Sequence, residues 1–359
     1  MQDLAVVVNR VVPLGWLPYG ASGSFDGQAL PALLGTVGLA LIGAASLRRS
    51  YQTTMRLYTG TFNAAVPSVR DTGAVSLEKK TPAVVSSAHS RKYSAAFLER
   101  RFAGLSEHAS AVAVASIRAI LRAPEAKLML LSPIIMVFVF GGMFFNRRTA
   151  PPELMRPLIA SGGFTFVFFM MLGMVGNQFS FDRTGFRTYV LSPTPRKDIL
   201  LGKNVAMAPF VVGFMLLTAV IFQFAYPMRA DHFIALLTQI LPMYLVFCLL
   251  GNILSIIAPM PTAAGSMKPV KPKAAIVFIH MAFLFLFPAA LSPTLIPLGI
   301  EFLLSYSRSS FSWFPVYLVL AIVEVAVVVW LYPKFLSSEG RLLERREQKI
   351  LEVVTTKAE

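Results

Sequence analysis

Leu158–Val175 (LIASGGFTFVFFMMLGMV) and Val205–Tyr226 (VAMAPFVVGFMLLTAVIFQFAY) are two apolar stretches on either side of the polar segment Asn177–Asn204. Neither stretch contains a charged residue, and each is long enough to cross a hydrocarbon core of about 30 Å as a helix. Neither shows the apolar-polar alternation of a strand in a membrane barrel. Because lipid offers no partner to backbone N–H and C=O groups, the pair predicts two membrane helices joined by a polar loop.

Other parts of the chain repeat this pattern. Charged residues make up 14% of the chain and hydrophobic ones 55%, whereas a soluble domain carries about 25% charged residues. Hydropathy therefore predicts an all-α membrane protein with seven spans. The five further spans are Ala29–Leu47, Leu128–Phe145, Phe233–Ala258, Ala274–Leu304 and Trp313–Tyr332.

The basic residues are distributed unevenly between the two sides of the predicted membrane. The segments on one side hold 27 of the 33 Lys and Arg residues, and the segments on the other side hold 6, three of them in Asn146–Pro157. The positive-inside rule then predicts a multi-pass protein of the plasma membrane (the bacterial inner membrane), with the C-terminus in the cytoplasm and the N-terminus outside. The net charge of +15 thus indicates orientation and does not indicate nucleic-acid binding. The 27 residues lie in Arg48–Lys127, Asn177–Asn204, Pro259–Lys273 and Lys334–Glu359.

Spacing along the chain predicts four parts. Residues 1–47 form an extracellular segment with a detached membrane helix, and residues 48–106 form a basic cytoplasmic linker. Residues 107–335 form a six-span bundle, and residues 336–359 form a cytoplasmic tail.

The bundle is preceded by a short amphipathic segment. Ser110–Leu121 carries Arg118 beside aliphatic residues and is followed by Arg122 and Pro124. We expect a helix that lies in the interface plane with its arginines near lipid headgroups. The alternative is an extension of the following span, against which Pro124 argues.

The sixth span is too long for one straight helix and is rich in proline. Pro288, Pro293 and Pro297 lie within Ala274–Leu304, and interior proline breaks or kinks a helix. We expect a helix that ends near Phe287, followed by a re-entrant or surface pair of half-helices. Irregular backbone at this depth must be covered by protein or line a cavity, so this region is predicted to be an outer gate.

Asn177–Asn204 (NQFSFDRTGFRTYVLSPTPRKDILLGKN) mixes aromatic residues with charges of both signs. Gly185 permits a sharp turn, and Ser192–Pro195 ends any helix before it. We expect a short surface helix, a proline turn, and then a helix that rises into the membrane. Aromatic and charged residues together are typical of a protein-docking surface. The alternative is a solvated loop whose arginines contact anionic lipid.

The run FDRTGFRTYVLSPTPRKDILLGKN, residues 181–204, resembles the cytoplasmic loop of ABC-2 type transporter permeases. The ending GRLLERREQKILEVVTTKAE resembles tails of the same group, and the order of elements in residues 107–335 fits its arrangement. The resemblance implies a six-helix ABC-2 bundle, here with an extra N-terminal helix. It also implies a partner ABC ATPase subunit, a homodimer or a second permease bundle, and ATP-driven export. The implied ATPase contacts are Phe181, Asp182, Arg183, Gly185, Arg187, Tyr189, Arg196 and Lys197.

The sequence offers no chemistry of its own for ATP hydrolysis. A phosphate-binding loop ends in Gly-Lys-Ser/Thr, whereas Gly202-Lys203 is followed by Asn204. We therefore expect a transporter subunit that is not an enzyme and binds no cofactor, with ATP and magnesium held by the partner. The single cysteine, Cys248, cannot form a disulfide framework or a metal cluster.

Three ionisable residues lie in predicted spans. Glu324 is near the centre of the last span, His280 is in the sixth, and Glu301 is near its outer end. Such residues are candidates for function, so a proton-coupled secondary transporter that uses Glu324 and His280 is the alternative function. A hydrogen-bonded helix contact is the structural alternative, and Glu301 is expected to cap the re-entrant pair. A scaffolding role is a third possibility.

The span Ala29–Leu47 is additional to the six of the bundle, and it predicts that the chain is, or descends from, the C-terminal part of a longer permease.

Overall fold

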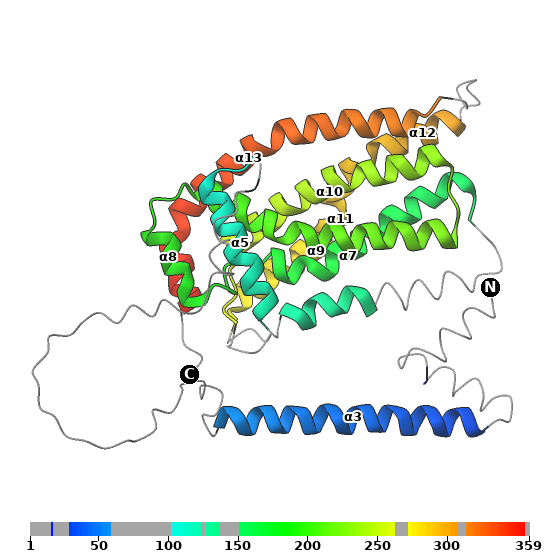
Figure 1. The fold of residues 1–359 in the computed structure, drawn as a ribbon. Helices are drawn as coiled ribbons and strands as arrows, with labels where there is room; N and C mark the ends of the chain where they lie inside the picture. The colour runs from blue at the N-terminus through cyan, green and yellow to red at the C-terminus, as the bar shows by residue number, and fades with distance from the viewer. Residues whose placement is uncertain are drawn as a thin grey trace, which may run out of the picture. The chain divides into compact units, whose positions relative to one another are not determined.

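A computed structural model describes residue 16 and residues 29–58, 102, 104–123, 126–135, 151–262, 272–306 and 314–355. The chain divides into two compact units, residues 1–86 and 87–359. In the first unit, helix α3 covers Ala29–Tyr58 (Figure 1). The predicted helix Ala29–Leu47 is confirmed, but it continues through Arg48, Arg49 and Arg56, which were predicted to lie in the linker. Most of that linker lies outside the described residues.

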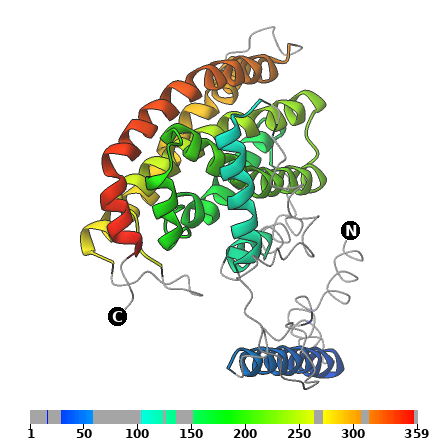
Figure 2. The same ribbon diagram turned by 60° about the vertical axis from the view of Figure 1, so that its left-hand side comes forward.

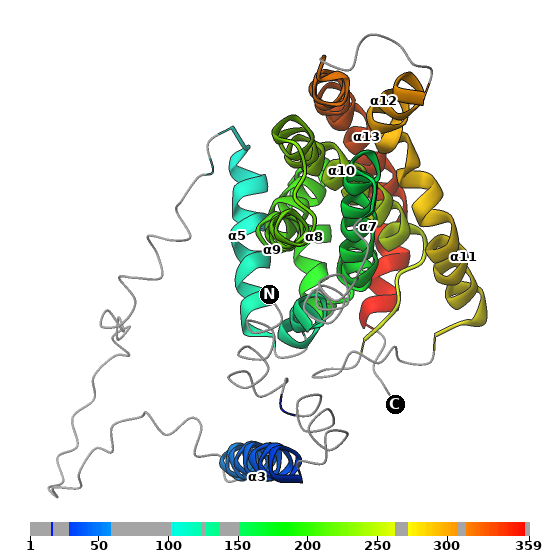
Figure 3. The same cartoon turned by 90° about the vertical axis from the view of Figure 1, so that its right-hand side faces the viewer.

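The second unit is a bundle of helices, as Figures 1 and 3 show. The all-α membrane fold is confirmed: six described helices, α3 among them, are long and apolar enough to cross a membrane. The predicted span Leu128–Phe145 is described only as the apolar helix Ala126–Ile135. The helices of this unit are α5 (Glu107–Arg122), α7 (Arg156–Val175), α8 (Phe186–Leu191), α9 (Arg196–Ala225), α10 (Ala230–Ile257), α11 (Ala274–Leu291), α12 (Ile296–Tyr306) and α13 (Val316–Thr355), with 3-10 turns η3 (Glu153–Met155), η4 (Arg183–Gly185) and η5 (Ser292–Leu295).

Helix α5 runs across the first turns of α9 (Figures 1 and 3). Ser106 caps it, because its hydroxyl accepts a hydrogen bond from the Ala109 N–H at 3.1 Å and so satisfies one free backbone donor. The same hydroxyl donates to the Asp198 carboxylate at 2.8 Å. A helix at the predicted place is thus confirmed, and its small-residue face is buried against α9. Its position in the interface plane stays a prediction. A Cβ on Gly202 would lie 2.7 Å from the Val112 Cβ, which shows how closely the helices approach.

The sixth predicted span is interrupted, as expected, but the break comes later than Phe287. Helix α11 accommodates Pro288 and continues to Leu291, and the chain then turns through η5 into α12. Thr294 stabilises this turn by donating its hydroxyl hydrogen to the Leu291 carbonyl at 2.7 Å. Helix α11 therefore ends before Ser292-Pro293, the first two residues of η5. Proline suits the first turn of a new helix, where its missing N–H is not needed.

Helix α13 has 40 residues and is therefore about 60 Å long, twice the thickness of a hydrocarbon core. The last span was predicted to end at Tyr332, and a separate tail was predicted to begin at residue 336. The structure shows one helix that continues through both positions. The helix instead curves around one end of the bundle (Figure 2). Pro333 lies inside it and removes one backbone hydrogen bond, which permits bending.

The C-terminal part of α13, residues 336–355, packs on the bundle through one face. Buried residues recur at intervals of three, four or seven along it, the spacing of one helix face. Gly340 permits the closest approach, since a Cβ there would lie 2.8 Å from the backbone nitrogen of Lys197. The buried apolar residues of this face are Leu336, Leu343, Ile350 and Val354.

Gly202→Ala tests the contact between α5 and α9. The added methyl would overlap the carbonyl oxygen of Ala109, 2.6 Å away, and overpacking costs about 1–3 kcal/mol. Gly213→Ala in the same helix is the matched control, because a Cβ there meets nothing within 4 Å. We expect thermal unfolding in detergent to show a lower midpoint for Gly202→Ala and an unchanged or slightly higher one for Gly213→Ala. Equal midpoints would contradict the close packing.

Candidate partner-binding site

The segment after α7 is tied to other helices by buried side-chain amides. Asn177 donates to the Met260 carbonyl and accepts from the Met260 N–H, both at 2.9 Å. Gln178 donates to Asn252 of α10 at 2.8 Å, and Asn252 donates to Glu339 of α13 at 2.8 Å. Buried polar groups that are paired in this way hold one arrangement of the chain. The start of the predicted coupling loop is thus fixed to α10 and α13.

Asp182 and Lys203 form an ion pair inside the loop. The Lys203 Nζ lies 2.6 Å from Asp182 Oδ2, and both side chains are largely buried. The ammonium also lies 5.6 Å from the Phe179 ring centroid and 5.4 Å from that of Tyr189, distances that allow cation–π attraction. Burial raises the pKa of Asp182, and the Lys203 charge opposes that rise; burial also raises the pKa of Tyr189. Removing either charge would leave the other buried and unpaired.

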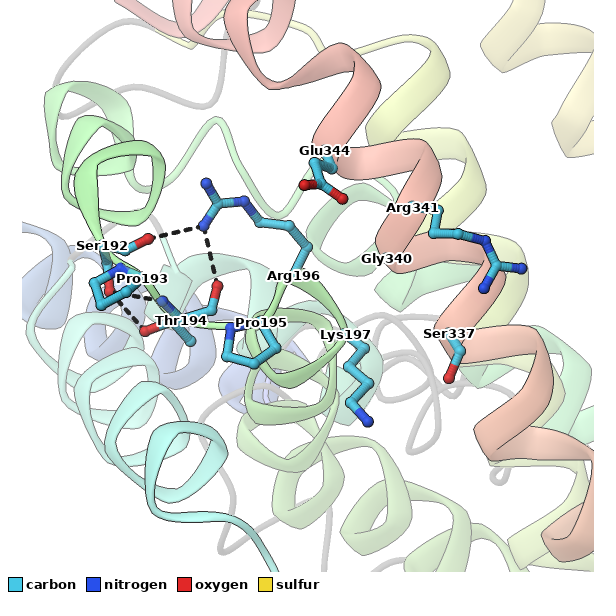
Figure 4. A pocket seen from close by; sticks show the side chains of 10 residues that line it. All are labelled: Ser192, Pro193, Thr194, Pro195, Arg196, Lys197, Ser337, Gly340, Arg341 and Glu344. Atoms are coloured by element: carbon cyan, nitrogen blue, oxygen red, sulfur yellow. Dashed lines mark hydrogen bonds between the residues drawn. The ribbon is translucent and has the colours of Figure 1, made fainter.

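Arg196 binds the end of α8, the proline turn and α13 simultaneously. Its Nη1 donates to the carbonyls of Ser192 and Thr194, both at 3.1 Å (Figure 4), and to the Tyr189 carbonyl at 2.8 Å. Its Nη2 donates to the Val190 carbonyl at 3.2 Å, and its Nε donates to Glu347 of α13 at 2.7 Å. The last carbonyls of a helix have no partner within it, and the guanidinium fork supplies donors for them. We call this set of bonds the Arg196 clamp.

The predicted order of helix, proline turn and helix is confirmed, because Phe186–Leu191, Ser192–Pro195 and Arg196–Ala225 follow one another. Before it, Arg183 adopts a left-handed backbone conformation with φ of 50°, which is uncommon for residues other than glycine. The turn at η4 therefore redirects the chain sharply at the start of α8.

The structure separates the predicted contact residues into an inner and an outer set. The interpretation of the aromatic residues as contact surface is wrong for Phe179 and Phe186, which are buried and pack edge to face at 5.1 Å. The aromatic residues therefore anchor the loop. Of the eight predicted contacts, Phe181, Asp182, Arg183, Tyr189 and Arg196 are partly buried, and Gly185, Arg187 and Lys197 are exposed.

One exposed residue on α8 was missed by the sequence analysis. Leu191 is 74% exposed and lies at the end of α8, near the exposed Arg187 and Thr188. An apolar side chain with cations beside it suits the centre of a protein contact. The sequence did contain a signal for this exposure, because Leu191 directly precedes Ser192-Pro193, where the helix must end.

A pocket of about 540 Å³ lies between the proline turn and α13 (Figure 4). Its walls are residues 192–197 on one side and Ser337, Gly340, Arg341 and Glu344 on the other. The sequence analysis did not predict it, because the two walls are more than 130 residues apart in the chain.

The opposite end of the bundle, where α12 lies, holds a second buried polar cluster. Glu301 accepts from the Tyr317 backbone N–H at 2.7 Å and lies 2.7 Å from His232 Nε2. Gln239 donates to the Thr294 carbonyl and accepts from the Tyr317 hydroxyl. The predicted cap at Glu301 thus belongs to the first turn of α13 and not to the re-entrant pair, since a carboxylate suits a helix N-terminus.

The other two intramembrane candidates are not brought together. His280 hydrogen-bonds through Nδ1 to the Ile276 carbonyl of its own helix at 3.0 Å. Glu324 Oε2 has no hydrogen-bond partner among the described residues. No contact between His280 and Glu324 is recorded in the described part of the chain, so their predicted pairing receives no support from the geometry.

A model of the ABC-2 type transporter family matches residues 107–298. These residues are more than half of the chain. The chain belongs to the ABC-2 type transporter family. The match begins at the first residue of α5, includes α8 and the proline turn, and ends within α12. No curated protein and no solved structure matches the chain.

Membership of the ABC-2 family makes the chain a multi-pass permease component of an ABC-type transporter. The family implies pairing with an ABC ATPase subunit. The parts of this permease that lie outside the family match include α3 and the whole of α13.

Arg196→Ala tests the clamp. Hydrogen bonds to a charged group contribute roughly 1.5–3 kcal/mol, and the change also leaves Glu347 without its partner. We expect faster hydrogen exchange in residues 186–195 and in the last turns of α13, measured by mass spectrometry on the purified permease. Lys197→Ala, the neighbouring exposed residue, should leave exchange unchanged. Equal exchange in the wild type and Arg196→Ala would contradict the clamp.

Proposed function

We propose that the permease is the membrane subunit of an ATP-driven exporter and that a separate ABC ATPase subunit binds at the α8 end of the bundle. ATP and Mg²⁺ are held by that subunit, and the permease supplies the path for the substrate. The binding surface comprises α8 and the proline turn, with Arg187, Leu191 and Lys197 exposed. Family membership and the resemblance of residues 181–204 support this assignment.

The Arg196 clamp is the observation that carries the proposal. A displacement of α8 by a partner must also move α9, which begins at Arg196, and α13, which holds Glu347. Packed elements joined by charge-assisted hydrogen bonds move together because separating them leaves buried charges unpaired. A partner that pushes on a six-residue surface helix would thereby act on two long helices of the bundle. This is the mechanical requirement for coupling ATP hydrolysis to transport.

We place the α8 end, and the C-terminus with it, in the cytoplasm of a bacterial inner membrane. The 27-to-6 division of basic residues supports this orientation. Arg156, one of the three arginines of Asn146–Pro157 on the outer side, donates to the backbone carbonyls of Pro151 and Pro227. That role accounts for a positive charge on the side where few are expected.

We further propose that the bundle works as a homodimer or with a second permease bundle. A path between two bundles needs apolar helix surface that is not covered within one of them. Helix α11 has such a surface, because Phe278, Phe285 and Leu286 are 73%, 77% and 66% exposed. In a monomer the same residues would face lipid.

Replacing Arg187 and Leu191 together by alanine tests the binding surface. Interface residues of this kind contribute about 1–2 kcal/mol each, so the double change should weaken binding of the ABC ATPase subunit that co-purifies with the permease at least tenfold. Affinity would be measured with the permease in lipid nanodiscs. Lys273→Ala, which removes an exposed charge before α11, is the control and should bind normally. Unchanged affinity of the double variant would contradict the proposed site.

Glu324→Gln separates ATP-driven from proton-driven transport. With both subunits in proteoliposomes, we expect the same ATP hydrolysis rate with and without an imposed pH gradient, in the wild type and in Glu324→Gln. Glutamine keeps the size of the side chain and cannot ionise. Transport that follows the pH gradient without ATP in the wild type, and is lost in Glu324→Gln, would favour the proton-coupled alternative.

A further inference from the structure

The pocket beside the Arg196 clamp has one wall on α13, which is not part of the ATPase-binding surface proposed above. One wall is the proline turn with Lys197, and the other is the C-terminal part of α13 with Ser337, Arg341 and Glu344 (Figure 4). The hydroxyls of Ser192 and Thr194 also line it. A solvent-accessible space with cations and hydroxyl groups on both walls can accept an anionic group.

The exposed face of α13 beside the pocket is basic. Arg341, Arg345 and Lys349 are exposed and follow one another at intervals of four residues, so they form one stripe on the helix. No ion pair is recorded for any of these three side chains in the described ranges. Arg196 is already engaged by Glu347, and Glu344 is the only acid that lines the pocket. The surface therefore offers free positive charge next to α8.

The depth of the pocket favours a protein over lipid headgroups as its occupant. Lys197 precedes Val205, where the charge-free part of α9 begins, by eight residues, or about 12 Å along the helix. The headgroup layer on each side of the hydrocarbon core is only about 5–8 Å thick. A Cβ on Gly340 of α13 would lie 2.8 Å from the Lys197 backbone nitrogen, so both walls of the pocket lie at the level of Lys197. If α9 stands along the membrane normal, this level is beyond the headgroups.

We infer that this pocket binds an acidic segment of the ATPase subunit, so that the partner contacts the proline turn and α13 as well as α8. The inference rests on the proposed function. Arg341 can hold a carboxylate through two parallel N–H donors, and Lys197 adds a point charge from the opposite wall. The Ser337 hydroxyl already donates to the Pro333 carbonyl at 2.7 Å. The Ser192 and Thr194 hydroxyls lie 2.6 Å apart, so this pair can supply one O–H donor to an occupant. Helix α13 lies outside the residues that the family model matches, so this half of the contact is argued from the pocket alone.

This arrangement places the partner on both sides of the Arg196 clamp. The clamp joins α8 to α13 from within, and an acidic segment between Lys197 and Arg341 joins the start of α9 to α13 from outside. Movement of the ATPase subunit would then reach α13 directly. That helix runs without interruption to Tyr317, whose backbone is held by Glu301 at the far end of the bundle.

Charge reversal tests the pocket. Lys197→Glu and Arg341→Glu should each weaken binding of the co-purifying ABC ATPase subunit at least tenfold, measured with the permease in nanodiscs of phosphatidylcholine alone. Binding by the wild type should weaken with rising salt, and the salt dependence should be smaller in each variant, because one attractive charge pair is lost. Lys273→Glu is the matched control, since it changes the net charge equally outside the pocket and should leave the affinity unchanged.

A second variant guards against misfolding as the cause. Ser337→Trp fills the pocket without changing charge and should also weaken binding tenfold or more, while the thermal unfolding midpoint of every variant stays close to that of the wild type. Normal binding by Lys197→Glu, Arg341→Glu and Ser337→Trp would overturn the inference. The inference would also be overturned if the variants bound the ATPase subunit normally in phosphatidylcholine and differed from the wild type only after anionic lipid is added. The pocket would then be a headgroup site.

The paired measurement on α8 distinguishes the two proposals. If the Arg187 and Leu191 double variant loses binding and the pocket variants do not, the proposed function stands and the pocket inference fails. If neither set loses binding, the docking assignment itself fails. Loss in both sets, with Lys273→Glu normal, supports both.

Discussion

The Arg196 guanidinium connects α8, the proline turn and α13 through one set of hydrogen bonds. It donates to carbonyls at the end of α8 and in the proline turn, and it binds Glu347 near the C-terminus of α13. A six-residue helix is too short to be stable alone in water, so α8 depends on these bonds and on the buried Phe186. The apolar core reaches this end of the bundle through Phe179, Phe186 and Leu343, and the polar contacts of Arg196 add to that packing.

Helix α13 extends the same principle through the bundle. Its first turn is held by Glu301, Glu339 in its middle binds Asn252, and its last turns bind Arg196. Each of these is a buried or partly buried polar pair, which costs free energy when broken. An element held at both ends and in the middle cannot shift at one end alone. This gives the molecule a continuous connection from the proposed cytoplasmic contact to the proline-rich region at the opposite end.

Much of this fold could be predicted from hydropathy, because twenty apolar residues in lipid have few structures open to them. The bounds of α9 and α10 and the interruption after α11 followed from apolar length and proline positions. The course of α13 did not, although Leu336, Leu343, Ile350 and Val354 already had the spacing of a buried helix face. The charged residues between them led to the prediction of a solvated tail. Which side chains of residues 177–204 turn inward also could not be predicted, since Phe186 and Leu191 look alike in sequence and only the packed structure separates them.

The partners of the charged residues were beyond sequence reasoning for a simpler reason. Arg196 and Glu347 are 151 residues apart, and His232 and Glu301 are 69 apart. No local pattern links such pairs, and only the packing of helices brings them together. The resemblance to ABC-2 permeases pointed to residues 181–204 without showing which of their side chains are exposed to a partner.

Site-specific photocrosslinking tests the central claim most directly. A photoreactive amino acid at Leu191 should crosslink to the ATPase subunit in intact membranes, whereas the same residue at Phe224, which is 73% exposed in the membrane part of α9, should not. A crosslink at Leu191 that depends on the ATPase subunit is the predicted result. Absence of that crosslink, in membranes where the two subunits co-purify, would contradict the placement of the partner on α8.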